Sequence, residues 1–165
     1  MTAHALPDPA DLGWALGRAV QRYQDLAARK LGALPSGIRG FRVLSTVAAG
    51  SGCSQLEIAT HLGIDRTQMT YLVDDLATAG LLERQPHPTD RRARTLVLTA
   101  TGEELLGHLE RAMAEVEGYL MAELSAGERD TLRALLLRVS VAAAAEPAPN
   151  GDALGPCAAI EQLLG

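Results

Sequence analysis

The chain has 165 residues, 47% of them apolar, and its 15 basic and 20 acidic residues give a formal net charge of −5. This length suits one domain, or one domain with an added oligomerisation element, and the apolar content is sufficient for a core. The acidic balance excludes a protein that binds polyanions over its whole surface, so any contact with nucleic acid must come from a local basic patch. Only 3% of the residues are aromatic, and packing by Leu and Ala favours helices over a β-sandwich.

The first two helices are marked by their ends. Asp8 and Pro9 are typical of a helix start, with Asp8 as the N-cap, and apolar residues follow at helical spacing up to a break at residues 34–37. A second helix is expected from Ile38 to about Ala49, before a Gly-Ser-Gly turn.

Two shorter helices follow. Ser54 and Glu57 form a capping box that opens the third helix, and Gly63 ends it. Asp65 caps a fourth helix, which Gly80 closes as a left-handed residue. The inward stripe of this fourth helix is predicted to consist of Met69, Leu72, Val73 and Leu76.

A basic β-hairpin is predicted next. Its first strand is expected from Leu81 to Gln85, and the prolines and aspartate of the segment P-H-P-T-D mark a reversal of the chain. Residues 95–99 alternate between polar and apolar, the period of a half-buried strand. The loop between the strands carries three arginines within four positions, namely Arg91, Arg92 and Arg94.

Two long helices are expected to complete the folded part. A T-x-x-E capping box, Thr101 and Glu104, predicts the start of the first, which runs to about Leu124. A second capping box, Ser125 and Glu128, opens the other. Residues 146–165 have a linker composition rich in Pro and Gly, so this tail is expected either to form a short helix or to remain disordered.

The third and fourth helices, joined through Leu62–Asp65, have the layout of a helix-turn-helix. The N-terminus of the fourth is where a recognition helix meets bases and phosphates. There Arg66 can read guanine, Gln68 can read adenine, and Thr can contact a phosphate or a thymine methyl. A polar helix face alone is more often simply solvated. The arginines immediately downstream favour DNA binding instead, because an arginine at a loop tip suits a narrow minor groove.

The arrangement resembles the MarR family of winged-helix regulators over roughly Leu12 to Ala145. The most specific segments are D90-R91-R92, L96-V97-L98-T99 with Gly102, and the stretches from Leu56 to Asp65 and from Leu76 to Leu82. The resemblance implies a mainly α fold with a small β-hairpin wing, in which a winged helix-turn-helix domain (residues 36–101) joins a helical dimerisation region (8–35 and 102–145). It further implies a homodimer, a pseudo-palindromic operator in double-stranded DNA, repression more than activation, and release by a small lipophilic or phenolic effector.

Carried onto this sequence, the resemblance assigns DNA binding to Arg66, Thr67, Gln68, Thr70 and Tyr71 of the recognition helix and to Arg91, Arg92 and Arg94 of the wing. For the effector, the aromatic and cationic residues of the first two helices suggest a site made of Trp14, Tyr23, Arg39 and Phe41. Ordinary core or dimer packing is the competing interpretation of these four residues.

Two other classes of function remain open. Tyr71 and Asp75 stand where related regulators often have a basic residue, which together with Asp74 and the overall acidity suggests a winged-helix protein-interaction module without DNA binding. A cysteine-based redox-sensing regulator would use Cys53 or Cys157.

Enzymatic, metal and membrane functions find little support in the sequence. It contains no G-x-S-x-G, no H-E-x-x-H and no phosphate-binding loop with its Lys, and its four histidines lack ligand spacing. We therefore expect neither an enzyme nor a cofactor or metal. The chain shows no secretory signal and no apolar run of membrane length, so a cytoplasmic protein is expected.

Overall fold

The computed structural model describes residues 11–50, 53–86 and 94–144. Over these ranges the fold is mainly helical with one two-stranded antiparallel sheet, as the sequence predicts. The elements in chain order are α1 (Leu12–Leu31), α2 (Ile38–Ala49), α3 (Gln55–His61), α4 (Arg66–Thr78), β1 (Leu82–Pro86), β2 (Arg94–Leu98), α5 (Ala100–Leu120) and α6 (Ala126–Ala144). No helix in these ranges is both long enough and apolar enough to span a bilayer.

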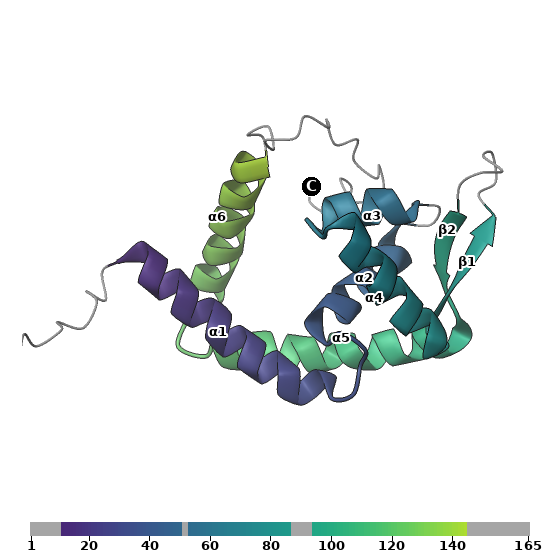
Figure 1. Ribbon diagram of the computed structural model, residues 1–165. Helices are drawn as coiled ribbons and strands as arrows, with labels where there is room; N and C mark the ends of the chain where they lie inside the picture. Colours follow the sequence, from purple (N-terminus) through teal and green to yellow (C-terminus); the bar gives the residue numbers. More distant parts are fainter. Residues whose placement is uncertain (1–10, 51–52, 87–93, 145–165) are drawn as a thin grey trace, which may run out of the picture.

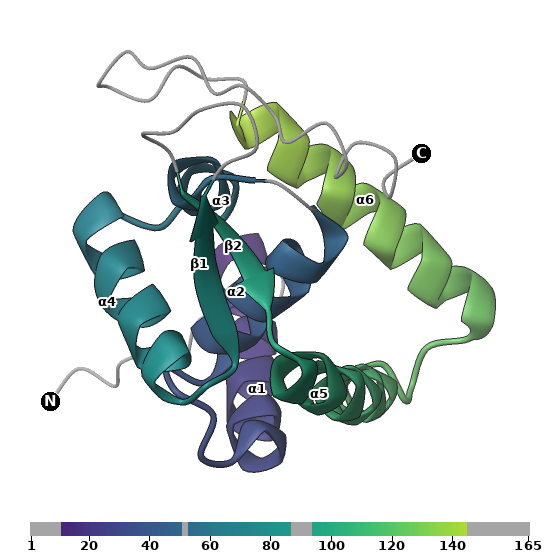
Figure 2. The same cartoon turned by 90° about the vertical axis from the view of Figure 1, so that its right-hand side faces the viewer.

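The molecule has a long helical base and a smaller helix–hairpin unit above it. Figure 1 shows α5 running along the base, with α1 packed across it, and α2, α3 and α4 grouped next to the hairpin. An ion pair of 2.6 Å between Lys30 Nζ and Glu115 Oε2 links α1 to α5. The Glu115 carboxylate also raises the pKa of Lys30. Figure 2, turned by 90°, shows the hairpin lying between α4 and α5.

One core joins the two parts. It draws on every element from α1 to α5, and α4 contributes the predicted stripe, with each of its four residues at most 4% exposed. The largest side chains that are fully buried are Leu44, Ile58, Met69, Leu76, Leu82 and Leu96. The helix-turn-helix is therefore held rigidly, because its inward faces are packed against α2 and β2.

Two helix starts differ from the prediction. The N-cap of α1 is Asp11, whose Oδ1 accepts a hydrogen bond of 2.9 Å from the Trp14 amide, so the expectation that Asp8 caps this helix was wrong. The N-cap of α5 is Thr99, whose Oγ1 accepts from the Gly102 amide at 3.0 Å, in place of the expected box at Thr101. Thr99 Oγ1 also donates to the carbonyl of Gly80 at 2.6 Å, a tertiary contact that favours the earlier start.

The other predicted caps are confirmed. Ser54 and Glu57 form a reciprocal capping box, and Asp65 Oδ1 accepts from the amides of Thr67 and Gln68 at 2.8 and 3.2 Å. Gly80 follows α4 with φ of +71°, the left-handed conformation expected for a residue that closes a helix.

The hairpin register pairs Leu82 with Leu98 and Pro86 with Arg94. Leu96 is buried as expected, but Thr95 is only 4% exposed, although the alternating pattern placed it on the polar face. Thr95 is covered because it pairs with Ser54, at the start of α3, through an isolated β-bridge. The sheet edge is thereby attached to the helix-turn-helix.

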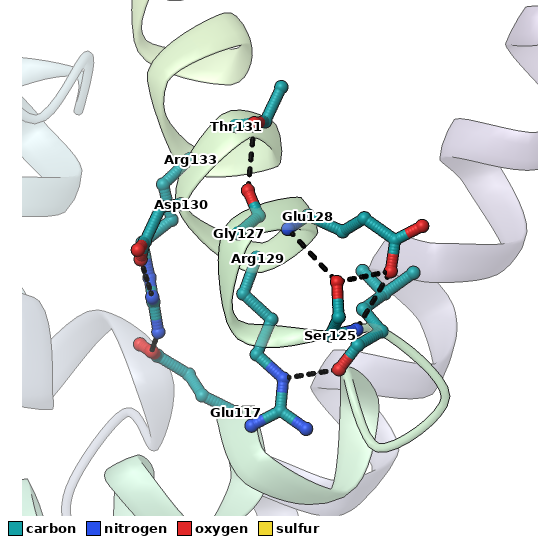
Figure 3. A network of polar contacts seen from close by, with 9 residues as sticks. Glu117, Ser125, Gly127, Glu128, Arg129, Asp130, Thr131 and Arg133 are labelled. Carbon is teal, nitrogen blue, oxygen red and sulfur yellow. Dashed lines mark hydrogen bonds and ion pairs between the residues drawn. The ribbon is translucent and has the colours of Figure 1, made fainter.

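The corner between α5 and α6 is built from charged contacts (Figure 3). Arg133 bridges Glu117 Oε2 at 3.1 Å and Asp130 Oδ1 at 3.4 Å, and Arg129 Nε donates to the Leu124 carbonyl at 2.9 Å. The predicted capping box is present, since the Ser125 hydroxyl and amide both donate to Glu128 Oε2. These two hydrogen bonds lower the pKa of Glu128 from its usual value of 4.5.

Candidate nucleic-acid interface

The turn between α3 and α4 sets the direction of the fourth helix. Gly63 adopts φ of +62°, and the Ile64 amide donates back to the Ala59 carbonyl at 2.8 Å. Ile64 packs against the core, and Asp65 then begins α4. A left-handed residue at Gly63 is what allows the chain to reverse within so few residues.

The outward face of α4 carries every residue predicted for a recognition helix. All five side chains are exposed, and Tyr71 is 68% exposed even though it is aromatic. The exposed residues are Arg66, Thr67, Gln68, Thr70 and Tyr71. Arg66 is the first residue of α4, so its charge lies at the positive end of the helix dipole, where Asp65 already caps the amides of Thr67 and Gln68.

Neighbouring helices hold two of these side chains. Arg39 Nη1, from the start of α2, donates to Gln68 Oε1 at 3.4 Å. Gln55 Nε2, from α3, donates to Thr70 Oγ1 at 3.2 Å, and that hydroxyl donates to the Arg66 carbonyl at 3.0 Å. Sequence reasoning missed these contacts, because their partners lie 29 and 15 residues apart and no local pattern connects them.

The wing is fastened to α4 by an ion pair. Arg84 Nη2 in β1 lies 2.6 Å from Asp74 Oδ1 in α4, and both side chains are partly exposed. Asp74 was one of the acidic residues that argued against DNA binding. Its charge is balanced by Arg84, which weakens that argument.

The base of the wing shares a hollow with the recognition helix. Arg94, the first residue of β2, and Arg66 line the same cavity of about 390 Å³, together with Gln55 and Leu56 of α3. The structure thus gathers one predicted wing arginine and one predicted recognition-helix arginine on a common surface. Arg91 and Arg92 lie outside the described residues.

The four residues suggested for an effector site lie in different surroundings. Tyr23 and Phe41 are partly buried against the core, and burial is the main cause that raises the pKa of Tyr23. Trp14 is 41% exposed and lies nine residues before Tyr23, about 13 Å along the axis of α1. Arg39 contacts the recognition helix. This site stays a prediction.

A different cavity lies where the helix–hairpin unit meets α5. It measures about 470 Å³ and has an apolar floor from α2, β2 and α5, including Val47, Leu96 and Leu106. Glu103 and Glu110, one helical face of α5, stand at its rim. Within the described part of the chain, no cluster of His, Cys, Asp or Glu is arranged to hold a metal ion.

Comparison with known proteins identifies the family. A model described as the MarR family matches residues 39–93. Over 99 residues the chain is 34% identical to a Thauera aromatica protein named as a transcriptional regulatory protein for the hcr operon, and this alignment spans 60% of either protein.

Several solved structures match over nearly their full length, among them two with informative bound partners. The transcriptional repressor CouR, bound to a 23-mer DNA duplex, is 30% identical with a TM-score of 0.71, covering 82% of this chain and 99% of CouR. The PcaV transcriptional regulator from Streptomyces coelicolor, in complex with its natural ligand, is 27% identical with a TM-score of 0.70, covering 84% and 99%. With its winged helix-turn-helix and these likenesses, the chain belongs to the MarR family.

Proposed function

We propose that this protein is a homodimeric transcriptional regulator that binds pseudo-palindromic operator DNA and acts as a repressor. The observation that carries the proposal is the shared surface of Arg66 and Arg94, where the recognition helix and the base of the wing present positive charge together. On a chain with net charge −5, such a local concentration of cations is what a phosphate backbone requires. CouR, similar over the whole winged helix, is a repressor bound to DNA.

We assign the roles of the residues from the sequence and, for those that the structure describes, from their positions. Residues at the N-terminus of α4 enter the major groove, where Arg66, Thr67, Gln68, Thr70 and Tyr71 reach bases and phosphates. The wing arginines, Arg91, Arg92 and Arg94, contact the backbone or the adjacent minor groove. Phosphate contacts fix the position of the protein, and base contacts supply the sequence preference.

The dimer is proposed from the surface of α1 and α6. In a single chain these helices expose a set of large apolar side chains that a soluble protein rarely leaves in water: Leu12, Leu16, Leu132, Leu135, Leu136 and Val139. A two-fold partner that covers this surface would also place two recognition helices on one face, as a palindromic operator needs. Residues 8–35 and 102–145 are accordingly assigned to dimerisation, and residues 36–101 to DNA binding.

We further propose release by a small lipophilic or phenolic effector. PcaV carries its natural ligand in the matching structure. In this chain the predicted residues Trp14, Tyr23, Arg39 and Phe41 remain the candidates for a carboxylate-bearing aromatic ligand, since the glutamates at the rim of the 470 Å³ cavity would repel an anion.

The test is a salt titration of binding to operator and scrambled DNA, the operator being selected from fragments of the source genome. Arg92→Ala should weaken binding to both DNAs and make the slope of log K against log salt shallower by about one unit. Arg66→Ala should cost roughly 1–3 kcal/mol at particular bases and relax specificity there. The matched control is Arg29→Ala, which removes the same charge from the last turn of α1, at the bottom of Figure 1.

The result also separates the two alternatives. A protein-interaction module would show no salt-dependent affinity for any DNA fragment, and all three variants would then resemble the wild type. A redox sensor would lose or gain DNA binding when the oxidation state of Cys53 or Cys157 changes, which mass spectrometry after treatment with peroxide or with a reductant would follow. Cys53 is buried, and Cys157 lies outside the described residues.

A further inference from the structure

The contact between Arg39 and Gln68 constrains what the recognition helix can read. Arg39 Nη1 lies 3.4 Å from Gln68 Oε1, and both side chains are exposed on the proposed DNA surface. A guanidinium group has only donors, so the end of the glutamine amide that faces it must be the oxygen. The NH₂ group of Gln68 is then left as the outward part of the amide.

Two further contacts fix the backbone on either side of this side-chain contact. The backbone N–H of Gln68, in the first turn of α4, donates to Asp65 Oδ1 at 3.2 Å. Arg39 belongs to the first turn of α2, and Gly40 beside it approaches the carbonyl of Pro35 so closely that a side chain there would clash. Both backbones are therefore fixed, although the 3.4 Å bond is long and depends on the positive charge for its strength.

A glutamine that reads adenine needs both ends of its amide. The oxygen accepts from adenine N6, while the NH₂ group donates to N7. With its oxygen turned toward α2 and one of its two lone pairs taken by Arg39, the Gln68 amide turns mainly its NH₂ group to the base edge, which weakens the first of these contacts. Guanine presents two acceptors, N7 and O6, on the same edge. These acceptors suit Arg39 and Gln68, which together turn N–H donors toward the base.

We propose that Arg39 is a positioning residue that orients the Gln68 amide, so that this position of the operator is read as guanine and not as adenine. The inference rests on the proposed DNA binding and goes beyond it, because it assigns a base preference to one side chain and a role in specificity to a residue of α2. It replaces the expectation, drawn from the sequence alone, that Gln68 reads adenine.

The experiment selects binding sites from a randomised operator library with the full-length protein. Gln68→Ala identifies the base pair in question as the position whose preference relaxes. At that position the wild type should prefer guanine over adenine by about tenfold or more. Arg39→Met, which keeps the aliphatic stem, should reduce this preference and admit adenine, and Arg39→Lys, which keeps a donor, should preserve it.

Two comparisons exclude trivial explanations. Arg42→Met removes the same charge one turn further along α2, where Arg42 interacts with Tyr23, so it should change overall affinity at most and leave the base preference unchanged. The double variant of Arg39 and Gln68 should relax the site no more than Gln68→Ala alone, because the two residues act as one unit. Thermal melts show whether each variant is folded.

The outcomes that overturn the inference are distinct from failure of DNA binding. Preference for adenine at the Gln68 position, or an Arg39→Met variant with unchanged preference, would refute the positioning role while the protein still binds selectively. Relaxation at a different base pair would show that Arg39 reads a base itself. If the wild type selects no sequence at all, the proposed function fails first.

Discussion

The apolar surface of α6 provides the most direct quantitative test of the proposed assembly. Leu135 and Leu136 are 49% and 45% exposed in the single chain, and they continue a stripe with Leu132 and Val139 at helical spacing. The charged corner of Figure 3 joins the start of α6 to α5 through partly exposed ion pairs.

The expected loss follows from the exposed area. Covering the exposed half of one leucine contributes about 1 kcal/mol, and a two-fold interface contains each residue twice. Replacing Leu135 and Leu136 together by alanine should therefore remove ~4 kcal/mol from dimerisation, a weakening of about a thousandfold. Alanine keeps the helix propensity of α6 high, so the local helix should persist.

Sedimentation at micromolar concentration measures this effect. The wild type should sediment at twice the chain mass of 17.4 kDa, and its melting temperature should rise with protein concentration. The double alanine variant should sediment as a monomer or, if the monomer does not fold, lose its helical circular dichroism.

A matched control comes from the other end of the molecule. Leu56→Ala removes a leucine that is 57% exposed on α3 and should leave the sedimenting mass unchanged. A wild-type monomer that binds a palindromic site would refute the reasoning, as would a double variant as dimeric as the Leu56→Ala control.

Three further predictions concern stability and the effector. Gly102→Ala should destabilise the fold by about 1–3 kcal/mol, since its Cβ would overlap the Leu81 carbonyl oxygen. Gly107→Ala on the same helix meets open space and should stabilise the fold by about 0.5–1 kcal/mol. Equal shifts of the melting temperature in the two variants would contradict this difference. Because the pKa of Glu128 is lowered in the folded protein, the ionised carboxylate contributes to the free energy of unfolding above the unfolded pKa of 4.5, and this contribution is lost as pH falls through the folded pKa. Glu128→Gln should therefore make the free energy of unfolding, measured by denaturant titration, depend less on pH in the acid range. An unchanged pH dependence would count against this role. An aromatic carboxylate should raise the melting temperature and weaken DNA binding together, while a phenolic screen that stabilises nothing would favour packing roles for the aromatic residues of α1 and α2.

Most of the fold was predictable because short-range signals specify it. The capping boxes at Ser54 and Ser125 and the glycine at position 80 act within a few residues, and the structure places helix ends there. The choice between neighbouring candidates was less predictable. Thr99 caps α5 because its hydroxyl also reaches Gly80 across the hairpin. A local sequence pattern does not predict this contact, because the two residues are 19 positions apart.

In the candidate site, too, local features were predictable and contacts between distant residues were not. Exposure of the α4 face follows from the apolar stripe opposite to it, so periodicity predicted which side chains face outward, whereas their assignment to DNA binding came from the family resemblance. What those side chains can do depends on partners distant in sequence. Arg39 was assigned to an effector site because it is a cation near aromatic residues, yet it contacts Gln68. Asp74 counted as an unpaired acid until the fold brought Arg84 beside it.

The junction between α5 and the hairpin links the helical base to the face proposed to bind DNA. The Thr99 amide donates to the Leu81 carbonyl at 3.1 Å, and Gly102 packs against the same peptide. Leu81 directly precedes β1, which the Arg84–Asp74 ion pair fastens to α4. A tilt of α5 cannot be absorbed at this close backbone contact, because packed interfaces shift as units and deform little. The wing and the recognition helix are therefore coupled to the start of α5, and in the proposed dimer an effector that tilted this helix would change the spacing of the two recognition helices.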